Sequence, residues 1–263
     1  MRLTKGFEVV YKGAQLGAKA TAESVARLAD PSAPAYRSGL APALQSVAPP
    51  PPGALYSPAE RIADGVIHVL GVVSSLVAIS VLITLAAIWT DFWTTASIAI
   101  YGVGACLLFS ISAAYHLFDW PRWRWLLRRL DHAAIFVKIA ATYTPFATVS
   151  LAGGWGEALL LMVWSIAAVG VPLKLFAPQR LERAAVALYL VQGWLVVLAF
   201  GPLAAALSPT ALALLVSGGL LYTFGVVFFL WERLPFHNAI WHGCVLAASA
   251  MMYGAVLTGV AMM

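Results

Sequence analysis

The stretch from Ile62 to Trp89 reads IADGVIHVLGVVSSLVAISVLITLAAIW, and its length and apolar character decide the fold class. A helix needs about 20 predominantly apolar residues to cross the hydrocarbon core of a bilayer. Six further stretches of this kind follow it, at Thr94–Phe118, Ala133–Leu151, Ala158–Phe176, Ala184–Phe200, Ala211–Trp231 and Phe236–Val260. The sequence therefore predicts an all-α membrane protein, folded as a bundle of seven transmembrane helices.

Composition supports this class. Of the 263 residues 62% are hydrophobic and 10% are charged, with a mean hydropathy of +0.86. Soluble domains hold roughly 25% charged residues. Glycine, proline and short polar clusters separate the apolar stretches, where helices are expected to end.

The basic residues predict the orientation of the bundle. With the amino terminus inside the cell, fifteen of the sixteen lysines and arginines fall in segments on the inner side, and only Lys138 lies within a predicted helix. Cytoplasmic segments of membrane proteins carry such an excess. We expect an N-in, C-out, multi-pass protein of the cell inner (plasma) membrane. The net charge of +5 then reflects topology and attraction to anionic lipid, so no nucleic-acid partner is expected.

The first 57 residues differ from the rest of the chain. They contain only short apolar stretches, several prolines and the run Pro49-Pro50-Pro51-Pro52-Gly53. Such a run favours extended polyproline over helix. We expect residues 1–57 to form a flexible, disordered cytoplasmic tail, and residues 58–263 to form the transmembrane domain.

Several kinds of site lack support in the sequence. Cys106 and Cys244 lie in predicted helices with no C-x-x-C neighbour, which argues against a zinc ribbon or redox motif. Neither a Gly-rich phosphate loop nor a nucleophile elbow is present. The last helix holds no lysine for a retinal Schiff base.

The polar residues of the apolar stretches gather at one depth. All five histidines lie near the predicted cytoplasmic ends of their helices, and a serine, an aspartate and an asparagine accompany them: His68, Ser112, His116, Asp131, His132, His237, Asn238 and His242. Ionisable residues in a membrane are costly and point to a functional site. Three helices deliver His116, Asp131 and His242 to similar depth, as a metal site in a bundle requires.

Each of these residues also fits a simpler role. A histidine near the membrane interface can extend its ring to the headgroups, which suits His132 and His237. Asp131 can cap the third helix, and Ser112 can hydrogen bond to the carbonyl one turn earlier. These roles do not explain why every histidine lies at the same end.

Three motifs resemble a known family. The strings SAAYH (residues 112–116), LDHAAIF (130–136) with TYTPF (142–146), and PFHNAIWHG (235–243) are similar to those of bacterial hemolysin III proteins, relatives of the progestin and adipoQ receptors and, more distantly, of alkaline ceramidases. The similarity covers roughly residues 57–263. It implies a zinc ion near the cytoplasmic face, bound by His116 and His242, with Asp131 beside the metal or its water and Ser112 as a polar neighbour.

The chain departs from the family pattern at two places. The family has two histidines four residues apart on the last helix, whereas Asn238 stands four residues before His242 here. His237 lies five residues before it, about 140° away around the helix. The site has then either lost a histidine or recruits His237, His68 or His132. Lys138, two turns above Asp131, stands where the family more often has an apolar residue; it either extends toward the carboxylate or marks a water-filled cavity.

The chemistry expected of an intact site is hydrolysis. Zinc held by three protein groups leaves a position for water, whose pKa falls to about 7. Asp131 would orient the water or take its proton, and Ser112 would donate to the oxyanion. We expect a zinc-dependent membrane hydrolase that acts on lipid amides of the inner leaflet and serves membrane homeostasis. The alternatives are a receptor-like sensor with structural metal, and a membrane-perturbing factor that causes cytolysis.

Overall fold

A computed structural model describes residues 56–151, 154–176 and 182–262. Nearly all of the predicted tail, residues 1–57, therefore lies outside the described residues. The compact unit that contains the helices is Ser57–Met263.

The described part of the chain is helical throughout and contains seven helical spans long and apolar enough to cross a membrane. They are built from α3 (Pro58–Trp89), α4 (Phe92–Leu117), α5 (Arg124–Pro145) with the π-helical turn Phe146–Ser150, α6 (Gly154–Phe176), α7 (Glu182–Trp194) with the 3₁₀ turn Leu195–Ala199 and α8 (Phe200–Ala206), α9 (Pro209–Leu230), and α10 (His237–Val256) with the π-helical turn Leu257–Ala261. The predicted fold class is confirmed: this is a multi-pass membrane protein.

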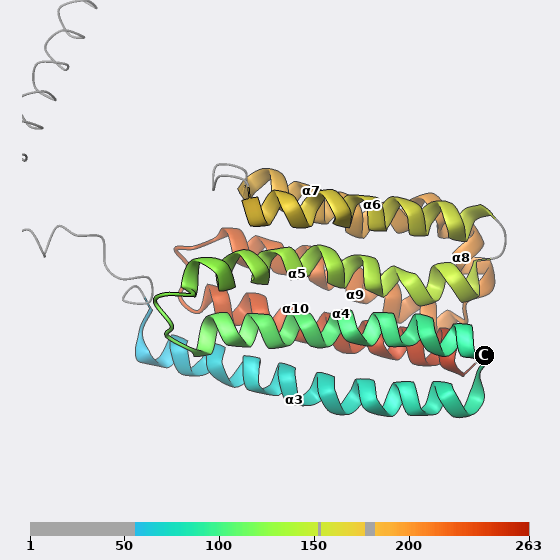
Figure 1. Ribbon diagram of the computed structural model, residues 1–263, viewed down its shortest axis with the longest axis horizontal. Coiled ribbons are helices and arrows are strands. Elements are labelled where there is room, and N and C mark those ends of the chain that lie inside the picture. Colours follow the sequence, from blue (N-terminus) through green and yellow to red (C-terminus); the bar gives the residue numbers. More distant parts are fainter. Residues whose placement is uncertain (1–55, 152–153, 177–181, 263) are drawn as a thin grey trace, which may run out of the picture. The chain divides into compact units, whose positions relative to one another are not determined.

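The spans run side by side along one direction, with α3 next to α4 and α10 (Figure 1). Small residues allow close contact between them, as is common in membrane bundles. A Cβ atom added at Gly104 of α4 would lie 2.5 Å from the Cβ of Ala141 on α5, and one added at Gly225 of α9 would lie 3.0 Å from the Cβ of Cys244 on α10. These contacts fix the mutual positions of the helices that carry the polar residues.

Two predicted helix boundaries were wrong. The third helix starts at Arg124 instead of Ala133, so Asp131 lies two turns inside α5 and does not cap it. The fifth span does not end at Gly201-Pro202 but continues as α8 to Ala206. Pro202 lies in the first turn of α8, where its missing N–H group would have no helical partner in any case.

The start of α3 is tied to the start of α10. Ser57 and Glu60 form a capping box, in which the Glu60 N–H donates to Ser57 Oγ at 3.2 Å and the Ser57 N–H donates to Glu60 Oε2 at 2.7 Å. The second carboxylate oxygen of Glu60 accepts the backbone N–H of Phe236 at 2.8 Å. Phe236 has a left-handed backbone with φ 61°, and α10 begins directly after it. The same end of the two helices is thereby held together.

Candidate metal centre

Four side chains from three helices converge at this end of the bundle. Asp64 and His68 lie one turn apart on α3, His116 lies at the end of α4, and His242 lies in the second turn of α10. Each offers a ligand atom, and these atoms all lie within 4.8 Å of one another. We call these four residues the His/Asp cluster.

The Asp64 carboxylate lies at the centre of the His/Asp cluster. Its Oδ1 is 2.6 Å from Nδ1 of His242, and its Oδ2 is 3.2 Å from Nδ1 of His116. Oδ2 is also 3.5 Å from Nε2 of His68. One nitrogen of each imidazole therefore faces the same carboxylate.

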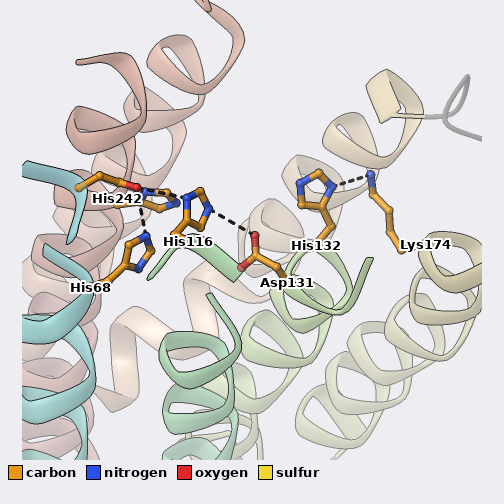
Figure 2. Close-up of polar contacts among 7 residues, drawn as sticks. His68, His116, Asp131, His132, Lys174 and His242 are labelled. Carbon is orange, nitrogen blue, oxygen red and sulfur yellow. Dashed lines mark hydrogen bonds and ion pairs between the residues drawn. The ribbon is translucent and has the colours of Figure 1, made fainter. Parts of the chain in front are cut away.

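The three imidazole rings also contact one another. The ring of His68 stacks on that of His116, with centroids 4.7 Å apart, and its centroid is 4.4 Å from that of His242. The centroids of His116 and His242 are 4.6 Å apart. Figure 2 shows the three rings turned toward one another from different helices. Three imidazole rings this close together are placed to bind one metal ion.

The donor set fits a zinc ion. Three imidazole nitrogens and a carboxylate oxygen are zinc ligands in proteins, and in tetrahedral coordination such atoms lie roughly 3.3 Å apart. Nε2 of His68 is buried and makes no hydrogen bond within the described part of the chain, although it faces Asp64. A buried nitrogen of this kind needs a partner, which an ion at the cluster would provide. Small rotations of the side chains would bring the ligand atoms together.

The His/Asp cluster is partly open to its surroundings. The His68 side chain is 3% exposed, whereas those of Asp64, His116 and His242 are 14%, 16% and 11% exposed. Apolar residues of α3 beside the cluster face outward: Ile62, Val66, Val69 and Leu70 are each more than half exposed. The helix that carries Asp64 and His68 therefore also presents an exposed apolar surface.

Asp131 lies beside the His/Asp cluster. Its Oδ2 is 4.0 Å from Nε2 of His116, the ring nitrogen that faces away from Asp64 (Figure 2). A second carboxylate on the far nitrogen of a metal-binding histidine orients the ring and raises its basicity. Ser112 is buried one turn before His116 on α4.

His132 points away from the cluster although it follows Asp131 directly. Its Nδ1 lies 3.1 Å from Nζ of Lys174 on α6 (Figure 2). The backbone carbonyl of His132 accepts the Tyr189 hydroxyl at 2.8 Å. These contacts hold α5 against α6 and α7.

Two further residues predicted near the site start α10. His237 is buried in the first turn and interacts electrostatically with Glu60 of α3. Asn238 lies one turn before His242. The left-handed backbone of Phe236 does not bring His237 into the His/Asp cluster.

Lys138 does not extend toward Asp131. It is 3% exposed, its Nζ donates to Thr142 Oγ1 at 3.0 Å, and it lies 4.9 Å from the ring centre of Tyr101. Thr142 is one turn further from Asp131 along α5. The hydroxyl and the aromatic face solvate the ammonium group deep in the bundle.

Comparison with known proteins identifies the family. The model of the family described as "Haemolysin-III related" matches residues 58–253. The chain belongs to the haemolysin-III related family.

Relatives are found in bacteria and in animals. The chain is 41% identical over 198 residues to "Hemolysin-3 homolog" of Bacillus subtilis (strain 168), covering 75% of this chain and 93% of the relative. It is 39% identical to "Hemolysin-3" of Bacillus cereus, covering 75% and 90%. It is 29% identical over 208 residues to "Monocyte to macrophage differentiation factor" of Homo sapiens, covering 75% and 83%. The predicted resemblance is thus confirmed.

Asp64 was absent from the sequence-based site. The signal that could have found it is local, because Asp64 and His68 are four residues apart and share a face of one helix. Asn238 stands where the resemblance predicts a second histidine on the last helix, and α3 supplies Asp64 and His68 to the His/Asp cluster.

Proposed function

We propose that this member of the family is a zinc-dependent hydrolase of lipid amides, acting in the cytoplasmic leaflet of the cell membrane. The observation that supports it is the convergence of three imidazoles on one carboxylate in a partly exposed cluster at the end of the bundle that the basic residues assign to the cytoplasm. His68, His116 and His242 are the groups that would hold the ion.

Zinc bound there would polarise the amide carbonyl and bring the pKa of a coordinated water to about 7. Asp64 is placed to take the proton of that water as it attacks the carbonyl carbon. The same carboxyl group can return the proton to the nitrogen of the leaving amine, so that the products are a fatty acid and an amine. Asp64 is close enough for this role, because its two oxygens face the nitrogens of His242 and His116 that would hold the ion.

Asp131 and Ser112 have supporting roles in this proposal. Asp131 orients His116 from its far nitrogen, at 4.0 Å. The hydroxyl of Ser112, one turn deeper on α4, would donate a hydrogen bond to the developing oxyanion. The substrate class follows from position, since the exposed apolar face of α3 lets an acyl chain approach from the bilayer.

Partial exposure favours hydrolysis over a structural metal. A structural zinc site is closed by four protein ligands, whereas a catalytic site keeps a position for water. In this proposal Asp64 acts as the base and is not the fourth ligand, so the three histidines leave that position free for water.

The test is hydrolysis of a long-chain N-acyl amine by the purified full chain after zinc loading. The released fatty acid would be measured by mass spectrometry for the wild type, His242→Ala and His132→Ala. We expect His242→Ala to abolish release and His132→Ala to retain it, because His132 contacts Lys174 outside the cluster. Equal release by the wild type and His242→Ala, or no release by wild type shown to contain zinc, would refute the proposal.

A further inference from the structure

The segment 118–125, which comprises the α4–α5 loop and the start of α5, has an unusual surface. Four aromatic side chains in it are between 49% and 59% exposed: Phe118, Trp120, Trp123 and Trp125. The rings of Phe118 and Trp120 stack with centroids 4.9 Å apart. Exposed tryptophans at the end of a transmembrane bundle belong at the level of the lipid headgroups.

A hydrogen-bonded turn shapes this loop. The backbone N–H groups of Trp123 and Arg124 both donate to the carbonyl of Trp120, at 3.0 and 2.9 Å. An open hollow of about 340 Å³ lies over the turn, lined by Trp120, Pro121, Arg122 and Trp123. Apolar atoms of these side chains make up nearly all of its lining.

The charge around the hollow is strongly positive. Residues 118–129 contain four arginines, at positions 122, 124, 128 and 129, and one acidic residue, Asp119. Arg124 lies 4.0 Å from Asp119, whose side chain is 88% exposed. Within the part of the chain that the structure describes, Arg122 has no carboxylate at ion-pair distance, and its guanidinium carbon lies 6.0 Å from the ring centre of Trp123. The segment therefore offers a cation beside the hollow without a fixed counter-ion.

We infer that the guanidinium groups of Arg122 and Arg124, beside this hollow, bind the phosphate headgroup of an anionic phospholipid. The planar guanidinium of arginine matches phosphate oxygens in a bidentate geometry. The flanking tryptophans favour a ligand with acyl chains that enter the bilayer. Free phosphate has no such chains. Charge and aromatic exposure together thus select a lipid.

The bound headgroup would lie close to the His/Asp cluster. The guanidinium carbon of Arg124 lies 5.2 Å from the ring centre of Tyr115, and that ring contacts His116 at 4.7 Å between centroids. Two side chains thus separate the headgroup site from a cluster histidine. Lipid binding at this site does not require hydrolysis at the His/Asp cluster.

The experiment measures which lipids the purified full chain retains. Protein in detergent is incubated with equal amounts of phosphatidylglycerol and phosphatidylcholine and repurified, and its lipids are quantified by mass spectrometry. The variant is Arg122→Gln with Arg124→Gln. The matched control is Arg61→Gln with Arg233→Gln, which removes two exposed arginines at the same end of the bundle.

We expect phosphatidylglycerol to be enriched on the wild type and on the control, and the enrichment to fall about tenfold or more in the Arg122/Arg124 variant, because only this variant loses the guanidinium groups that would contact the phosphate directly. Millimolar glycerol phosphate should leave the lipid bound. A wild type without lipid preference would overturn the inference whatever the variant does. Equal loss in the control, or full displacement by glycerol phosphate, would overturn it as well.

Discussion

Asp64 and His68 are four residues apart on α3, and the carboxylate of Asp64 faces histidines from two other helices. If Asp64 is the base, Asp64→Asn should lower hydrolysis at least about 100-fold, the usual contribution of general acid–base catalysis. Zinc affinity, measured by chelator competition at fixed pH, should change less than about tenfold. Glu232→Gln, at the same end of the bundle, is the control and should change neither. Loss of zinc from Asp64→Asn would instead make Asp64 a ligand.

Asn238 lies one turn before His242 and stands where the resemblance predicts a histidine. Since His68 already provides a third imidazole, Asn238→His should add a fourth ligand, tighten zinc binding by more than about tenfold, or 1.4 kcal/mol, and suppress hydrolysis by closing the position for water. His237→Ala should leave the zinc content unchanged, because His237 lies outside the cluster. Loss of zinc from His237→Ala would contradict this arrangement.

At the scale of the residue, only part of the site could be predicted from the sequence. It could place His116, Asp131 and His242 at one depth, because depth follows from helix direction. It could not show that α3 lies against α10 there, since that contact, which includes a hydrogen bond from the Phe236 N–H to Glu60, joins segments far apart in the sequence. Asp64 therefore remained unnoticed within an apolar stretch.

At the scale of the element, α4 begins with a charged cap. Hydrogen bonds from the Thr94 hydroxyl, at 2.5 Å, and from the backbone N–H groups of Thr94 and Trp93 hold the pKa of Asp91 below its usual range. A depressed pKa in the folded state means that the cap stabilises fully above the unfolded pKa, about 3.9, and loses this effect as the pH falls through the folded value.

Asp91→Ala should therefore lower the midpoint of thermal unfolding at pH 7, and the difference from the wild type should shrink below about pH 4. Ser208→Ala, which removes the uncharged cap of α9, should give a difference that does not depend on pH. Thermal unfolding followed by circular dichroism at pH 7 and pH 3 checks both. A pH-independent effect of Asp91→Ala would show that its charge is unimportant.

Helix directions can be tested with single cysteines in a chain lacking Cys106 and Cys244. Asp119→Cys should react with a membrane-impermeant thiol reagent only after cells are opened, whereas Gly154→Cys should react in sealed cells, because the basic residues place the α4–α5 loop inside. Both positions are exposed. Reaction of Asp119→Cys in sealed cells would show that the cluster lies in the other leaflet.

Apolar length was enough to find the seven spans, because a bilayer requires it. Helix ends were harder to predict where polar or breaking residues continue a helix. Arg124, Arg128 and Arg129 precede Asp131 within α5, and Pro202 lies inside α8. In both places backbone hydrogen bonds continue the helix although composition suggests a loop.

At the scale of the whole molecule, the central claim is that the bundle holds one zinc ion between α3, α4 and α10. The most direct measurement is elemental analysis of the purified full chain after zinc loading and removal of free metal, at fixed pH because protons compete for histidine. The wild type and His132→Ala should retain about one zinc per chain. His68→Ala, His116→Ala and His242→Ala, checked for folding by circular dichroism, should each retain far less. Folded wild type without zinc, or the same zinc content in all three cluster variants, would contradict the claim.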